Sequence, residues 1–217
     1  MKTNKIYLII VTVLFLSTNN LLAQETNLFN NSKHRIGFNT GFGYQKISIA
    51  IPDDEVEGGV IYVESGLNVE YKYEVSYFQA QYYYGFLRKK SWGLDLLVQP
   101  QFNQTKYRFL NTDLEDIKGY EFGVNFGLLI RKNIFKDFLS FYLCLSVGPH
   151  YISGAPERQS KGFIFSDNLF GGANIKIYKN AYLDFRYGFR HISNASLTKR
   201  NGGINNIIYS LGILVNL

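Results

Sequence analysis

The chain has 217 residues, including 18 Phe, 17 Tyr, 20 Gly, 4 Pro and one Cys, and its formal net charge is +6. This aromatic, Gly-rich and Pro-poor composition favours strands over helices. The single Cys144 excludes an internal disulfide framework. The mild positive charge forms no Lys/Arg cluster, so we expect no nucleic-acid partner and only weak attraction to anionic lipid headgroups.

The N-terminus has the pattern of a targeting segment. Lys2 and Lys5 precede an apolar run from Ile6 to Leu16. This run is too short to cross a bilayer as a helix, which needs about 20 apolar residues. We therefore expect a cleaved signal peptide over residues 1–23 and one mature domain over residues 24–217.

From residue 36 onward, apolar or aromatic side chains alternate with polar ones and glycine. This period of two predicts eight strands. They are separated by short turns (88–91, 132–137 and 179–180) that alternate with long loops (about 50–60, 108–118, 152–162 and 192–204). Such a layout is typical of an outer-membrane barrel. We predict an all-β fold, an eight-stranded antiparallel transmembrane β-barrel, with Asp184, Arg186 and Arg190 paired inside its lumen.

The second strand, about residues 61–86, departs from a single alternation. Placing Tyr71, Tyr73 and Val75 on the lipid side requires a slip near Tyr77-Phe78, for which a β-bulge is the simplest explanation. We interpret most of the tyrosines as girdle residues at the bilayer surface.

The tail from Tyr182 to Leu217 predicts a hairpin whose first strand ends at His191-Ile192-Ser193-Asn194. Alternation along the first strand puts His191 on the lipid side, and alternation counted back from Leu217 puts Asn205 there too. A base and a hydroxyl at the outer rim, facing lipid, suit an enzyme that acts on a membrane lipid.

This tail resembles the outer-membrane lipid A 3-O-deacylases (PagL-type), which are small eight-stranded barrels. The resemblance rests on His191-Ile192-Ser193-Asn194-Ala195, Leu197 and Asn201-Gly202-Gly203-Ile204, supported by Arg158-Gln159 and Gly162-Phe163-Ile164-Phe165-Ser166-Asp167. It implies hydrolysis of an ester-linked acyl chain of lipid A or lipopolysaccharide at the outer-leaflet side of a Gram-negative outer membrane. It also implies Ser193 as the nucleophile, His191 as its general base and Asn194 as an oxyanion-hole donor.

The family places a Glu fourteen residues after the His, where this chain has Asn205. An amide can orient an imidazole but supplies no charge to stabilise its protonated form. Asp167, near the end of the preceding strand, is a possible alternative orienting acid or a water-facing loop aspartate. No cofactor motif or metal-ligand spacing is present in the sequence, and we expect neither group.

Two other classes of protein stay open at this point. The first is a non-catalytic outer-membrane barrel, structural or adhesive, with a degenerate deacylase site. The second is a soluble periplasmic β-protein, which would alternate in the same way but would bury its apolar face. A general porin is the least favoured class, because the lumen of an eight-stranded barrel is filled by side chains.

Overall fold

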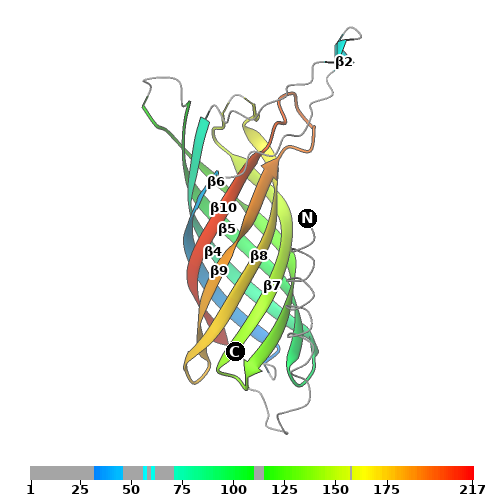
Figure 1. The fold of residues 1–217 in the computed structure, drawn as a ribbon, viewed down its shortest axis with the longest axis vertical. Coiled ribbons are helices and arrows are strands. Elements are labelled where there is room, and N and C mark those ends of the chain that lie inside the picture. The colour runs from blue at the N-terminus through cyan, green and yellow to red at the C-terminus, as the bar shows by residue number, and fades with distance from the viewer. Residues whose placement is uncertain (1–31, 46–55, 58–59, 62–70, 110–114, 157) are drawn as a thin grey trace, which may run out of the picture.

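The computed structural model describes residues 32–45, 56–57, 60–61, 71–109, 115–156 and 158–217. Eight of the described strands close into one antiparallel barrel in the order β1-β10-β9-β8-β7-β6-β5-β4 (Figure 1). Their bounds are β1 His34–Tyr44, β4 Tyr71–Arg88, β5 Trp92–Phe109, β6 Ile117–Phe135, β7 Leu139–Ile152, β8 Gly162–Tyr178, β9 Ala181–Ser193 and β10 Ile204–Asn216. The two remaining strands, β2 Val56–Glu57 and β3 Val60–Ile61, pair only with each other. The predicted fold class is confirmed, whereas the predicted signal peptide over residues 1–23 lies outside the described residues.

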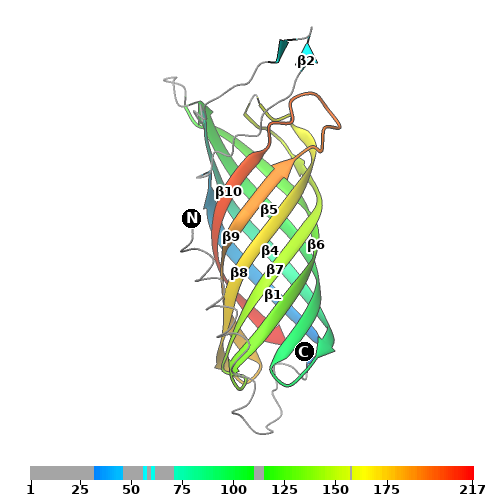
Figure 2. The same cartoon turned by 45° about the vertical axis from the view of Figure 1, so that its right-hand side comes forward.

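The strand connections differ in length at the two ends of the barrel. Three tight turns lie at one end, the lower end in Figures 1 and 2 (89–91, 136–138 and 179–180). The strand ends that the longer connections join lie at the other end; of these connections, 153–161 and 194–203 are described except for residue 157, and those after Tyr44 and after Phe109 are described only in part. The C-terminus lies at the end with the tight turns, where Leu217 N donates to His34 O at 2.9 Å. The predicted alternation is confirmed at the strand ends, although β6 continues to Phe135 and the turn expected over 132–137 is shorter, at 136–138. The loops expected at about 50–60 and 108–118 lie partly outside the described residues.

The outer wall of the barrel is apolar. Leu145 is 60% exposed and Phe126 is 56% exposed, and large apolar side chains are exposed on all eight barrel strands. The buried set includes Asn, Gln, Arg, Asp and Glu side chains that point into the lumen. This inside-out distribution suits a lipid environment and excludes the soluble barrel, which would bury its apolar face. None of the described residues forms a helix long and apolar enough to cross a membrane.

Ion pairs fill the lumen at several levels. Arg186 pairs with Asp184 at 2.7 Å, and Arg190 pairs with Glu121 at 2.5 Å nearer the long loops. At the opposite end, Asp95 pairs with both Arg35 and Arg131. These charges are almost completely buried, so each pair stabilises partners that would be costly to leave alone. The prediction that Asp184, Arg186 and Arg190 pair in the lumen is confirmed.

The predicted bulge in the second strand is wrong. The pairing of β4 with β5 is continuous from Tyr71 to Gln79, and its irregularity lies between Gly85 and Leu87. Tyr71, Tyr73, Val75 and Tyr77 therefore face the lumen. The Tyr73 hydroxyl donates to Glu121 Oε1 at 2.5 Å, and the Tyr77 hydroxyl donates to Ser210 Oγ at 3.1 Å. Tyrosine rings fill the lumen while their hydroxyls bond to its polar groups, so these residues are not girdle residues.

Candidate active site

His191 and Asn205 are direct partners in the β9–β10 ladder. Antiparallel partners point to the same face, and both side chains are half-buried on the outer wall near the long loops. His191 Nδ1 lies 2.7 Å from Asn205 Oδ1. Since a carbonyl oxygen only accepts, Nδ1 is the donor in this arrangement and Nε2 is left to take a proton. The structure thus brings together the predicted base and the predicted third residue.

Ser193 is the last residue of β9, two positions after His191. Alternation along the strand puts its half-buried side chain on the same outer face as the imidazole. Among the described residues, no hydrogen bond joins the Ser193 hydroxyl to the His191 ring. Such bonds are often long in the absence of substrate and tighten when it binds. Hydroxyl, imidazole and amide therefore share the outer face at the rim, with Ser193 next to His191 along β9 and Asn205 opposite His191 on β10.

Asp167 lies on the other side of His191. It is the register partner of His191 in the β8–β9 ladder, and its side chain is exposed on the outer face. Within the described residues, no hydrogen bond links Asp167 to the imidazole, whose Nδ1 is bonded to Asn205. The position of Asp167 agrees with the sequence-based expectation. Its role as the orienting acid stays a prediction, and the hydrogen bond favours Asn205 for that role.

Asn194 is fully buried, and both its backbone nitrogen and its side-chain amide nitrogen donate within the β9–β10 loop. Its Nδ2 donates to Thr198 Oγ1 at 2.6 Å and, more weakly, to the carbonyls of Thr198 and Arg200, each at 3.3 Å. Its backbone N donates to Asn201 Oδ1 at 2.7 Å. In this conformation Asn194 organises the loop. Its predicted oxyanion-hole role stays a prediction that requires one of these donors to turn toward the substrate.

A tight turn follows the predicted nucleophile directly. Leu197 N donates to Asn194 O at 3.0 Å across Ala195 and Ser196, whose φ angles are +50° and +61°. Two consecutive non-glycine residues in the left-handed region are unfavourable, and such strain often marks functional sites. The sequence carries no Gly or Asn at these two positions, so the turn could not be predicted from it.

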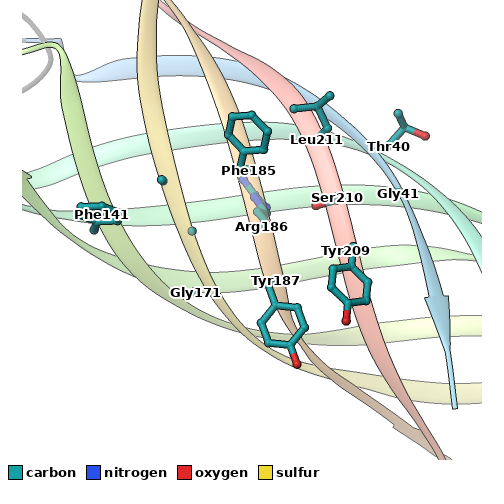
Figure 3. Close-up of a pocket in the computed structure, with 12 residues that line it drawn as sticks. Thr40, Gly41, Phe141, Gly171, Phe185, Arg186, Tyr187, Tyr209, Ser210 and Leu211 are labelled. Atoms are coloured by element: carbon teal, nitrogen blue, oxygen red, sulfur yellow. The ribbon is translucent and has the colours of Figure 1, made fainter. Parts of the chain in front are cut away.

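A hollow lies on the outer wall over β7, β8, β9, β10 and β1 (Figure 3). It is nearer the tight turns than His191 and Ser193 are. Its volume is about 730 Å³, and its lining includes Gly171, Phe185, Tyr187 and Tyr209. Tyr187 precedes His191 by four residues on β9, which corresponds to about 13 Å along a strand. The hollow is thus apolar, lies on the outer wall and begins about 13 Å from His191, toward the tight turns. The described residues hold no group of three His, Cys, Asp or Glu side chains that could bind a metal ion.

A comparison with models of protein families gives one match. The model of the lipid A 3-O-deacylase (PagL) family matches residues 65–213, which is more than half of the chain. No curated protein matches the sequence.

Among solved structures, Neisserial surface protein A is 11% identical, with a TM-score of 0.47 over 86% of this chain and 98% of that one. OprG from Pseudomonas aeruginosa is 14% identical, with a TM-score of 0.40 over 85% and 96%. Ail of Yersinia pestis is 14% identical, with a TM-score of 0.42 over 84% and 98%. The family match identifies the chain as a member of the lipid A 3-O-deacylase (PagL) family of the Gram-negative outer membrane.

Proposed function

We propose that this protein is an outer-membrane serine esterase that removes an ester-linked acyl chain from lipid A or a related lipid. The observation that carries the proposal is the hydrogen-bonded pair His191–Asn205 on the lipid-facing wall, with Ser193 beside it, in a chain of the deacylase family. The active side is then the outer-leaflet end, where the long loops lie.

The proposed chemistry uses Ser193, His191 and Asn205. The Ser193 hydroxyl attacks the ester carbonyl carbon while His191 Nε2 takes its proton. The tetrahedral intermediate expels the sugar alkoxide, which receives that proton from the imidazolium, and an acyl-Ser193 ester remains. Water, deprotonated by His191, then attacks the acyl-enzyme, releases the fatty acid and restores the serine hydroxyl. No cofactor enters this sequence of steps.

Orientation and charge are divided between two residues in this proposal. Asn205 fixes the imidazole through its hydrogen bond at 2.7 Å but is neutral. Asp167, on the neighbouring strand, supplies a negative charge on the other side of the ring. Directly opposed residues in a sheet have Cβ atoms about 5 Å apart, which is close enough for a carboxylate to stabilise an imidazolium. Asp167 thereby compensates in part for the amide at position 205.

The hollow on the outer wall suits the apolar part of such a substrate. Its volume is within the range of about 300–1,000 Å³ that is usual for small-molecule sites. Tyr187, the lining residue nearest to Ser193 on β9, precedes it by six residues, about 20 Å along the strand, so the distal part of a long acyl chain held at Ser193 is the part that would reach the hollow. Gly171 leaves part of this space, because a Cβ there would meet only ordinary contacts at 3.9 and 4.0 Å.

The test is to incubate the purified barrel with lipopolysaccharide and to measure the molecular mass of the lipid A by mass spectrometry. We expect wild type to remove one acyl chain and Ser193→Ala to remove none. An unchanged mass with wild type, or an equal loss with the mutant, refutes the proposal. Labelling with a serine-reactive fluorophosphonate tests the alternative of a non-catalytic structural or adhesive barrel. In such a barrel, Ser193 should not react with the probe.

A further inference from the structure

The loop between β7 and β8 is joined to the loop between β9 and β10. Gln159 forms a β-bridge with Asn201, and Ser160 N donates to Arg200 O at 2.9 Å. Gly202 N donates to Arg158 O at 2.8 Å. The loop that follows Ser193 therefore does not stand alone, because a second loop holds it by backbone pairing.

Within this pairing, one side chain is directed at a single peptide next to the site. Gln159 is only 3% exposed, and its Oε1 accepts from Gly203 N at 3.1 Å. The carbonyl of Gly203 accepts a longer bond, 3.5 Å, from the Tyr71 hydroxyl. Gly203 has a φ of +64°, a conformation that glycine adopts at little cost. Side chains from two other parts of the chain thus hold both sides of Gly203.

Gly203 also lies beside the proposed base, with no room for a side chain between them. A Cβ at this position would lie 2.6 Å from His191 Cε1 and 3.3 Å from His191 Nε2. The Gly203 backbone therefore forms a wall against the ring edge that carries Nε2, while Asn205 holds Nδ1 from the other edge. Moving Gly203 by a few tenths of an ångström would free the ring to turn or press it away from Asn205.

We propose that Gln159 is a positioning residue, which sets the orientation of His191 by fixing Gly203 against its ring. This inference rests on the proposed esterase function and deepens it. Gln159 has no hydrogen bond to the imidazole; its Oε1 holds Gly203 N, while its Nε2 donates to the Ser160 carbonyl of its own loop at 3.2 Å, so in this proposal it acts on the ring through Gly203. Catalysis by the β9–β10 hairpin then depends on a side chain from the β7–β8 loop.

The test compares two substitutions at position 159 with a control in the same pair of loops. Gln159→Met keeps the length of the side chain but removes the amide oxygen, whereas Gln159→Glu keeps an acceptor oxygen. Ser160→Ala removes the hydroxyl bonds to the carbonyls of Lys199 and Arg200 without touching Gly203. The readouts are kcat and KM for a p-nitrophenyl ester in micelles, the rate of Ser193 labelling by fluorophosphonate, and heat-modifiable gel migration as a check of folding.

We expect Gln159→Met to lower kcat and the labelling rate about tenfold with KM unchanged, as befits one lost hydrogen bond at an alignment-sensitive position. Gln159→Glu should recover most of this loss, and Ser160→Ala should stay within about twofold of wild type. Wild-type kcat in folded Gln159→Met, or an equal loss in Ser160→Ala, overturns the inference. If Gln159→Met does not fold, Tyr71→Phe releases the other side of Gly203, and an unchanged kcat there also overturns it. A wild type that neither hydrolyses nor labels refutes instead the esterase function.

Discussion

The amide at position 205 makes the most direct test of the proposed chemistry. Asn205→Asp changes almost no volume and keeps an acceptor oxygen at the place that now lies 2.7 Å from His191 Nδ1. What it adds is a negative charge beside the ring. That charge stabilises the imidazolium that forms as Ser193 loses its proton, so we expect a higher kcat.

The size of the gain follows from the difference between two kinds of hydrogen bond. A neutral bond contributes about 1 kcal/mol net, whereas a bond to a charged group contributes about 1.5–3 kcal/mol. A difference of about 1.4 kcal/mol is tenfold in rate. The two kinds of bond therefore differ by about 0.5–2 kcal/mol; about 1.4 kcal/mol lies within this range, so we expect about a tenfold increase for this half-buried pair.

The assay is release of fatty acid from lipopolysaccharide by equal amounts of folded wild type and Asn205→Asp. Because Asp167 already supplies some charge in our proposal, the same substitution made in an Asp167→Asn background should give a larger gain. A kcat that is unchanged or lower in both backgrounds, with wild-type gel migration, would refute the argument that charge at position 205 limits the rate.

Three further outcomes are expected. Asn205→Ala should lower kcat more than Asp167→Asn, by about tenfold against about threefold, because only Asn205 is bonded to the imidazole; the reverse order of the two losses would assign orientation to Asp167. Arg190→Met leaves the carboxylate of Glu121 buried without its partner, which should cost about 3–5 kcal/mol of unfolding free energy in urea titrations, and Arg190→Met with Glu121→Gln should recover most of it. Gly171→Leu should slow hydrolysis of long-chain esters without slowing fluorophosphonate labelling, since a Cβ at Gly171 meets only ordinary contacts at 3.9 and 4.0 Å and the larger side chain fills the hollow; equal losses in both assays would mean that the substitution disturbs the site itself.

The fold could be predicted because lipid imposes one simple rule on the outer wall. Every second residue of a barrel strand meets hydrocarbon, so positions such as Phe126 and Leu145 show the strand period directly. The rule constrains the lumen much less. The sequence-based prediction for Tyr71 and Tyr73 is wrong because a tyrosine suits either side, with an apolar ring and a polar hydroxyl.

In the candidate site, too, strand residues could be predicted from the sequence and loop contacts could not. His191 and Asn205 could be placed on the same face, because alternation can be counted along both strands of the hairpin; that they are direct partners is seen only in the ladder. The contacts of Asn194 and Gln159 could not be foreseen. They join loop residues that share no periodicity, and the β-bridge between Gln159 and Asn201 spans two separate loops.

The outward direction of His191 and Asn205 also determines how a ligand reaches them. If the proposed function holds, a lipid substrate reaches this site on the barrel wall by lateral diffusion within the leaflet and not through the lumen, which side chains fill. The concentration that governs its occupancy is then the mole fraction of the lipid in the leaflet or micelle. Diluting the substrate with inert detergent should slow turnover even when the total amounts of enzyme and substrate are unchanged.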